Sequence, residues 1–247
     1  MIITFMQTNQ QLFKVQVINR HRLLTDGEGV TTLIGLAGCP LKCKYCINMD
    51  ILGKQKYRPM SAQELLDKVM IDYCYFLTTG GGLMFGGGES LLHGEAILEF
   101  LKIRPMGMKV YMETSMNYES PVLDEVLEKV DYFLIDVKSL DDAIYEQYTG
   151  LSSVVMKKNL QRICEKGLQN KCRIRIPIIP GYKTEEQANQ EAEIIKTMGF
   201  SDVEVFSYIL RDYMHVGDLT SAGLVEKTEQ QETPVEDEEN YTLEEGC

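Results

Sequence analysis

The chain of 247 residues has 44% hydrophobic and 25% charged residues and a formal net charge of −12. This balance is typical of a globular protein and excludes a fibrous chain or one that is disordered over most of its length. Nine acidic residues and one lysine lie between positions 226 and 247, so most of the charge belongs to that end. We predict one folded domain over residues 1–218 and an acidic, disordered tail over residues 219–247.

Composition also argues against two classes of partner. No run of lysine and arginine forms the clustered basic surface that nucleic acid requires. The apolar runs are far shorter than the ~20 residues that a bilayer-spanning helix needs, and the first residues lack the basic and apolar regions of a secretory signal. We therefore expect a cytoplasmic protein that binds neither nucleic acid nor a membrane.

Apolar strands and amphipathic helices alternate along the chain. Residues 1–22 contain two short apolar runs around a polar one and are a candidate hairpin. The predicted strands are Thr31–Ala37, Leu83–Phe85, Lys109–Thr114, Tyr132–Asp136, Arg173–Ile178 and Asp202–Tyr208. Helix starts are marked by a capping box of Ser61 with Glu64, by Ser120 before Pro121, and by Thr184 with Gln187.

This alternation predicts βαβ units and hence a parallel sheet. In the last strand but one, Arg173 and Arg175 lie on one face and three isoleucines lie on the other. A parallel sheet that is buried on both faces does not accommodate two arginines unless their face lines a polar cavity. The predicted fold is therefore α/β, a partial (β/α)6 TIM-like barrel of parallel strands with a ligand in its lumen.

The seven cysteines carry the strongest chemical signal. Cys39, Cys43 and Cys46 have the spacing C-x3-C-x2-C directly after the first predicted parallel strand. In a reducing compartment, closely spaced thiols are metal ligands or redox groups rather than a disulfide framework. Three thiolates can hold three irons of a [4Fe–4S] cubane and leave the fourth iron open. A structural zinc, which takes four ligands, and buried cysteines without a metal are the alternatives.

A glycine-rich segment supports the cluster. Gly86, Gly87 and Gly88 precede Glu89 at the end of the second predicted parallel strand, where backbone without Cβ atoms can approach a ligand closely. Alone this signal is weak, because a tight strand-to-helix turn also uses glycine. Together with the cysteine spacing, and with Tyr45 before the third cysteine, it makes the chain resemble the radical S-adenosylmethionine (SAM) superfamily.

Further motifs resemble a narrower family, the glycyl-radical-enzyme activating enzymes, most nearly the pyruvate formate-lyase activating type. The order and spacing of these motifs carry the resemblance from Leu24 to Leu210. The motifs are Asp26-Gly27-Glu28-Gly29, Tyr75-Phe76 with Gly80-Gly81-Gly82, Glu113-Thr114-Ser115, Asp136-Val137-Lys138, and Arg175 with Pro180-Gly181. The resemblance implies a radical SAM oxidoreductase that cleaves SAM to a 5′-deoxyadenosyl radical, which abstracts a glycine Cα hydrogen from a partner glycyl-radical enzyme.

The resemblance also implies the roles of individual residues. The cluster ligands are Cys39, Cys43 and Cys46, and the residues assigned to SAM are Tyr45, Gly87, Gly88, Glu89, Glu113, Ser115, Asp136, Lys138 and Arg175. Lys138 and Arg175 suit the SAM carboxylate, although a solvated ion pair of Lys138 with Asp136 is an alternative. Glu113, Thr114, Asp136 and the Leu134 carbonyl would hold a monovalent cation. No side chain acts as an acid or base, because hydrogen-atom abstraction requires none.

One residue departs from the pattern of the family, and three cysteines lie outside its motifs. Ile209 stands where the family supplies a histidine to SAM, and His215 is the candidate replacement. Cys74, Cys164 and Cys172 are expected to be small buried hydrophobic residues.

The target and the electron donor are less well defined by the sequence. One alternative is a radical SAM enzyme that acts on a small molecule or a peptide precursor, and another is a non-catalytic iron–sulfur or zinc-binding module. The resemblance implies flavodoxin or ferredoxin as electron donor. Lys42 and Lys44 flank Cys43 and are candidates for a docking patch, or else solvated loop lysines.

Overall fold

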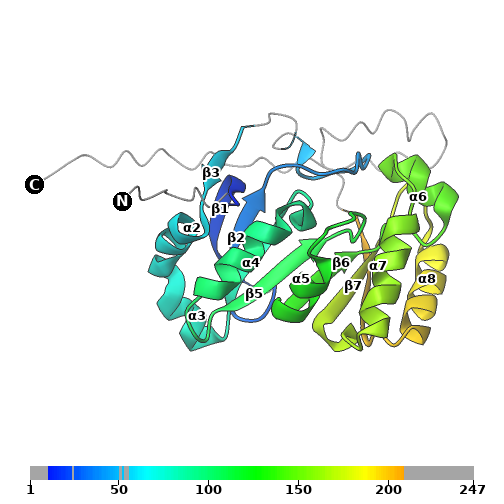
Figure 1. The fold of residues 1–247 in the computed structure, drawn as a ribbon. Helices are drawn as coiled ribbons and strands as arrows, with labels where there is room; N and C mark the ends of the chain where they lie inside the picture. The colour runs from blue at the N-terminus through cyan, green and yellow to red at the C-terminus, as the bar shows by residue number, and fades with distance from the viewer. Residues whose placement is uncertain (1–10, 24, 50–51, 53–55, 209–247) are drawn as a thin grey trace, which may run out of the picture.

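The computed structural model describes residues 11–23, 25–49, 52 and 56–208 (Figure 1). Its strands form one sheet in the order β3-β1-β2-β4-β5-β6-β7-β8. The strands are β1 (Phe13–Leu23), β2 (Val30–Leu36), β3 (Arg58–Met60), β4 (Gly82–Gly87), β5 (Lys109–Thr114), β6 (Tyr132–Asp136), β7 (Cys172–Ile178) and β8 (Asp202–Ser207). The α-helices are α2 (Ala62–Val69), α3 (Tyr73–Thr79), α4 (Gly94–Ile103), α5 (Leu123–Lys129), α6 (Asp142–Thr149), α7 (Val154–Glu165) and α8 (Glu185–Thr197), with 3-10 turns at Met70–Asp72, Ser90–His93 and Gln169–Lys171.

The parallel part of the sheet confirms the predicted fold. Strands β2, β4, β5, β6, β7 and β8 pair in parallel with their neighbours in chain order, and helical segments connect them. Figure 1 shows these helices side by side along one face of a curved sheet. The strand bounds agree closely with those predicted, because apolar runs of this kind mark strands that are buried on both faces.

The two strands that extend the sheet beyond β2, β1 and β3, were not predicted. From Phe13 onward the candidate hairpin is one strand, which pairs antiparallel with β2 and, at its start, with β3. Its partly exposed, alternating burial pattern is typical of an antiparallel strand with one face toward solvent. Residues 1–10, and with them the rest of the candidate hairpin, lie outside the described residues, as do residues 209–247 with Ile209, His215 and the predicted domain boundary.

Two of the three helix starts form as predicted. Both capping boxes are present, Ser61 with Glu64 and Thr184 with Gln187. The third helix, α5, begins two residues later than Pro121 suggested. Instead of capping a helix, the Ser120 hydroxyl accepts a hydrogen bond from the Val122 backbone N–H at 3.4 Å, which closes a local turn.

Two apolar layers cover the parallel strands. The larger layer packs the outer side chains of the strands, such as Phe85 and Ile135, against the helices. A smaller layer of Met84, Tyr111 and Leu134 lies on the opposite, inner face. No helix in the described part of the chain is long and apolar enough to cross a membrane.

Candidate active site

The inner face of the parallel strands changes from apolar to charged toward their carboxyl ends. Side chains two residues apart on a strand share a face, so Glu113 follows Tyr111 and Asp136 follows Leu134 on the inner side. The register of β6 with β7 places Arg175 beside Asp136. Charged groups from three strands therefore meet at the end of the barrel where active sites of such folds are built.

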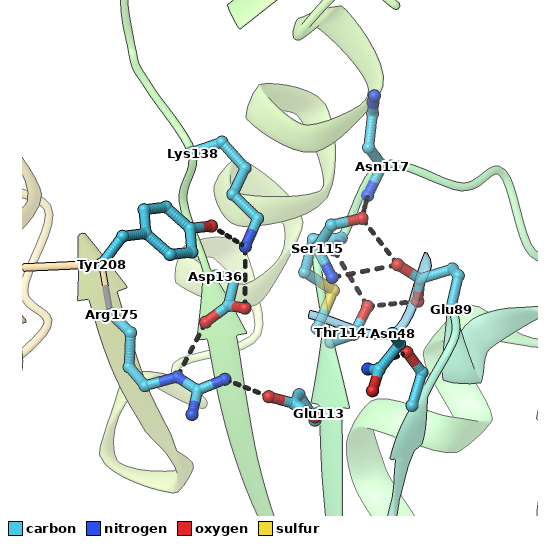
Figure 2. A network of polar contacts seen from close by, with 12 residues as sticks. Asn48, Glu89, Glu113, Thr114, Ser115, Asn117, Asp136, Lys138, Arg175 and Tyr208 are labelled. Carbon is cyan, nitrogen blue, oxygen red and sulfur yellow. Dashed lines mark hydrogen bonds and ion pairs between the residues drawn. The ribbon is translucent and has the colours of Figure 1, made fainter. Parts of the chain in front are cut away.

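These groups form a connected set of ion pairs (Figure 2). Arg175 Nε donates to Asp136 Oδ1 at 2.7 Å, and its Nη2 pairs with Glu113. Lys138 Nζ donates to Asp136 Oδ2 at 2.9 Å and to the Tyr208 hydroxyl at 3.2 Å. The side chains of Lys138 and Asp136 are only 12% and 17% exposed, so the alternative of a solvated surface pair is wrong.

Mutual attraction keeps Asp136 and Lys138 ionised in spite of burial. Burial by itself raises the pKa of Asp136, but Lys138 and Arg175 outweigh it and hold that pKa below its usual value. Burial likewise disfavours the charged form of Lys138, yet Asp136 keeps the pKa of Lys138 well above normal. The cations are therefore available to an incoming carboxylate at neutral pH.

The loop after β2 carries the three cysteines to the same end of the barrel. Cys39, Cys43 and Cys46 are each partly buried. Backbone hydrogen bonds on both sides of Cys43, from Lys42 N to the Thr149 carbonyl (2.8 Å) and from Lys44 N to the Tyr148 carbonyl (3.2 Å), attach the loop to the end of α6.

One cavity of about 370 Å³ brings together the three predicted cluster ligands and the nine residues assigned to SAM, a volume within the range of small-molecule sites. Its wall includes Cys39, Cys43, Tyr45, Cys46, Gly87, Gly88, Glu89, Glu113, Ser115, Asp136, Lys138 and Arg175. The wall also includes Asn48, Thr114 and Tyr208, none of which was assigned to SAM from the sequence.

The donor set of this cavity fits the cluster that the cysteine spacing implies. Among the described residues, no three His, Cys, Asp or Glu side chains are grouped as ligands of a single metal ion. The three cysteines instead share the wall of the cavity, and the described residues that line it include no fourth cysteine or histidine. These three cysteines would hold three irons of a cubane and leave the fourth iron without a protein ligand. Burial raises the pKa of Cys39 to about 12 and that of Cys43 to about 11, so iron must displace the thiol protons.

Gly88 is required by packing within the protein. A Cβ atom at Gly88 would lie 2.1 Å from the Gly38 carbonyl oxygen and 2.8 Å from that of Leu36. The Gly88 N–H donates to the Leu36 carbonyl at 3.0 Å, and the Glu89 N–H donates to the Gly38 carbonyl at 2.8 Å. The glycine segment thus holds the start of the cysteine loop, so close ligand approach is not the only reason for glycine here.

The buried carboxylate of Glu89 is occupied by hydrogen bonds within the chain (Figure 2). Its Oε1 accepts from the Thr114 hydroxyl at 2.5 Å and from the Leu91 N–H at 3.1 Å. Its Oε2 accepts from the Ser115 N–H at 2.9 Å and the Ser115 hydroxyl at 2.6 Å. Glu89 therefore positions the ends of β4 and β5, which the sequence motif alone did not reveal.

Other side chains that the sequence did not single out hold the cavity wall in place. Asn48 Nδ2 donates to the Gly87 carbonyl at 2.8 Å, which links the cysteine loop to the glycine segment. The Tyr45 hydroxyl donates to the Pro180 carbonyl at 3.2 Å, which links the same loop to the turn after β7. The position of Asn48, two residues after the last cysteine, was the only sequence signal for its role.

A buried ion pair between Lys183 and Glu191 holds the backbone at Lys138 in place. Lys183 Nζ donates to Glu191 Oε2 and to the Lys138 carbonyl, both at 2.7 Å. Glu191 Oε1 accepts from the Ser139 hydroxyl at 2.5 Å and from the Leu140 N–H at 2.7 Å. The pair therefore fixes the backbone that directs Lys138 into the cavity.

The remaining described cysteines differ in environment. Cys172 is buried, as expected, and Cys164 is partly buried. Cys74 is exposed on α3, so its prediction as a buried residue is wrong.

A larger cavity of about 760 Å³ shares Cys39 and Leu41 with the cavity that holds the predicted site residues, but it lacks the convergent ion pairs.

The sequence and the fold match those of known proteins. The model of the radical SAM superfamily matches residues 33–189. The pyruvate formate-lyase-activating enzyme of Clostridium pasteurianum is 32% identical over 188 residues, which cover 75% of this chain and 78% of that protein. The (2S)-3-sulfopropanediol sulfolyase activating enzyme of Bilophila wadsworthia is 25% identical over 236 residues, covering 71% of this chain and 77% of that protein. The crystal structure of Streptococcus suis SuiB bound to S-adenosylmethionine has the same fold, with a TM-score of 0.58 at 17% identity over 71% of this chain and 40% of that one.

The chain therefore belongs to the radical SAM superfamily. Within it, the chain is an enzyme of the activating type, and the superfamily implies a [4Fe–4S] cluster and SAM. This excludes the alternative of a non-catalytic metal-binding module.

The packing of Gly88 predicts the effect of a single methyl group. Gly88→Ala should lower the free energy of unfolding by about 1–3 kcal/mol, because the Cβ overlaps backbone that cannot move independently. It should also reduce the iron bound per chain. Gly80→Asn is the control: a Cβ there meets nothing within 4 Å, and asparagine tolerates the left-handed backbone (φ +73°) better than other side chains do, so we expect a smaller loss of stability and no loss of iron. Equal stability and iron content in the two variants would contradict the packing argument.

The buried pair behind Lys138 predicts a second effect. Lys183→Met should lower the free energy of unfolding by about 3 kcal/mol, because it leaves the charge of Glu191 buried without its partner. Lys183→Met combined with Glu191→Gln should recover much of this loss in chemical denaturation. SAM should bind the single variant more weakly, since the backbone of Lys138 loses its support. A single variant as stable as the wild type would contradict this role.

Proposed function

We propose that this protein activates a glycyl-radical enzyme: it cleaves SAM reductively and abstracts a Cα hydrogen atom from one glycine of that partner. The observation that carries the proposal is the shared cavity, whose wall joins the three cysteines to the ion pairs of Lys138 and Arg175. The names of relatives that cover three quarters of the chain support the activating role. The glycyl radical left on the partner is stabilised by its two flanking amides.

The chain's own residues bind and orient SAM in this proposal. Lys138 and Arg175 exchange their carboxylate partners for the SAM carboxylate, Arg175 through its planar guanidinium. The glycine segment and Ser115 line the remainder of the site. With the cluster bound at Cys39, Cys43 and Cys46, one electron cleaves SAM to methionine and a 5′-deoxyadenosyl radical.

The same exchange explains how a monovalent cation can enter. Arg175 lies between Glu113 and Asp136 and supplies the positive charge that a cation would supply. When Arg175 turns to the SAM carboxylate, both carboxylates are released. We propose that a monovalent cation then binds between them, with Thr114 and the Leu134 carbonyl as further ligands.

The electron enters near Cys43 in this proposal. Lys42 and Lys44 are exposed on either side of this cysteine. Flavodoxin and ferredoxin are typically acidic, and a local basic patch favours their encounter with an acidic protein. The proposal places this electron transfer in the reducing cytoplasm, where such donors work.

Loss of one cluster ligand tests the SAM chemistry. Under anaerobic conditions, reconstituted and reduced protein should convert SAM to 5′-deoxyadenosine, and Cys43→Ala should abolish this product, because the cluster loses one of its three protein ligands. Cys74→Ala, which changes an exposed thiol outside the cavity, should retain wild-type turnover. Equal product from the wild type and Cys43→Ala, measured by chromatography, would refute the assignment.

Electron spin resonance tests the target. The reduced, SAM-loaded protein is mixed with a glycyl-radical enzyme encoded beside it, and we expect a stable doublet from a glycyl radical. Replacement of the acceptor glycine by alanine should remove the doublet. SAM cleavage without a doublet, together with a modified small molecule or peptide, would contradict the glycyl-radical target and support the other class of radical SAM enzyme.

A further inference from the structure

Helix α6 carries two buried tyrosines, one of which has no hydrogen-bond partner for its hydroxyl group. Tyr145 and Tyr148 are both 0% exposed. The Tyr148 hydroxyl lies within reach of Tyr208, whereas the Tyr145 hydroxyl has no partner within the described residues. Buried polar groups are nearly always paired, because an unmade hydrogen bond in the interior costs the desolvation energy of the group. Such a group next to a site calls for an acceptor that the site itself supplies.

Tyr145 lies in the core beneath the cysteine loop, near enough for the charges of Cys43 and Cys39 to act on its hydroxyl. The loop around Cys43 is hydrogen-bonded to the last residues of α6, and Figure 1 shows this loop passing next to the helix. Cys39 and Cys43 pack against the same hydrophobic cluster to which Tyr145 belongs. Tyr148 lies further toward the ion pairs, with its ring 6.2 Å from that of Tyr208.

The Tyr145 hydroxyl is a donor under all relevant conditions. Burial raises its pKa above the usual value, and the charges of Cys43 and Cys39 act in the same direction. A protonated phenol beside a negatively charged sulfur donates a hydrogen bond to it. Hydrogen bonds to the sulfurs of an iron–sulfur cluster raise its reduction potential, because they stabilise the added electron.

We propose that Tyr145 donates a hydrogen bond to a sulfur of the cluster, either Cys43 Sγ or an adjacent sulfide, and thereby raises the reduction potential of the cluster. This inference rests on the cluster of the proposed function but not on the identity of the radical acceptor. Tyr145 is a positioning residue in this role, because it acts through the cluster and does not touch the reacting carbon atoms.

Redox titration of the reconstituted full chain tests the inference. Tyr145→Phe removes only the hydroxyl, and at a fixed applied potential it should lower the ratio of reduced to oxidised cluster about tenfold, which corresponds to ~59 mV for a one-electron couple. Tyr111→Phe is the control: this buried ring lies at the opposite end of the lumen, where its hydroxyl accepts from the Glu28 N–H at 3.3 Å. The control should leave the ratio unchanged.

A second measurement detects the hydrogen bond directly, and its first step uses the wild-type protein. After exchange into deuterated buffer, pulsed electron spin resonance of the reduced cluster should detect strongly coupled deuterons, and Tyr145→Phe should remove one of them while those on backbone N–H groups, such as that of Leu41 toward Cys39, remain. Wild-type deuterons that all persist in Tyr145→Phe, an unchanged potential in Tyr145→Phe, or loss of a deuteron only in Tyr148→Phe would each overturn the inference. A wild-type chain that binds no cluster would instead refute the proposed function.

Discussion

The buried residue Glu89 connects the strand ends at the active-site end of this barrel through hydrogen bonds. Three of the four hydrogen bonds to its carboxylate join the segment after β4 to the end of β5, and the fourth, from the Leu91 N–H, is local. The backbone N–H of the same residue donates to the Gly38 carbonyl at the start of the cysteine loop. The pairing of parallel strands positions the strands but not the loops that follow their carboxyl ends. Because this one residue connects the ends of β2, β4 and β5, it holds the cysteine loop at the same end of the barrel as the ion pairs, where they line one cavity.

Much of the fold was predictable because its signals are local. Buried parallel strands are continuous apolar runs, and capping boxes such as Ser61 with Glu64 need only a spacing of three residues. The positions of Asp136 and Lys138 on one side of a strand followed from the period of two. Where a local signal competed with packing it failed, as at Pro121, where a turn precedes the helix, and at Cys74, whose helix exposes it.

The supports of the site were not predictable, because they depend on segments far apart in the sequence. Lys183 and Lys138 meet only after the chain has turned back from β7. The link from Asn48 to the Gly87 carbonyl likewise spans two strands of the sheet. A lysine on a polar loop and an asparagine after a cysteine are common in any sequence. Only their burial and their partners distinguish them from solvated residues.

The ion pairs in the cavity also determine the electrostatic force that the site exerts on a distant ligand. Lys138 and Arg175 carry two positive charges, and Glu113 and Asp136 carry two negative ones, so the four groups sum to zero. SAM carries a net positive charge through its sulfonium, and a neutral set exerts little long-range pull on it. These groups therefore do not raise the rate at which SAM reaches the site by diffusion. The site distinguishes SAM from other cations only on contact, when the ion pairs exchange partners.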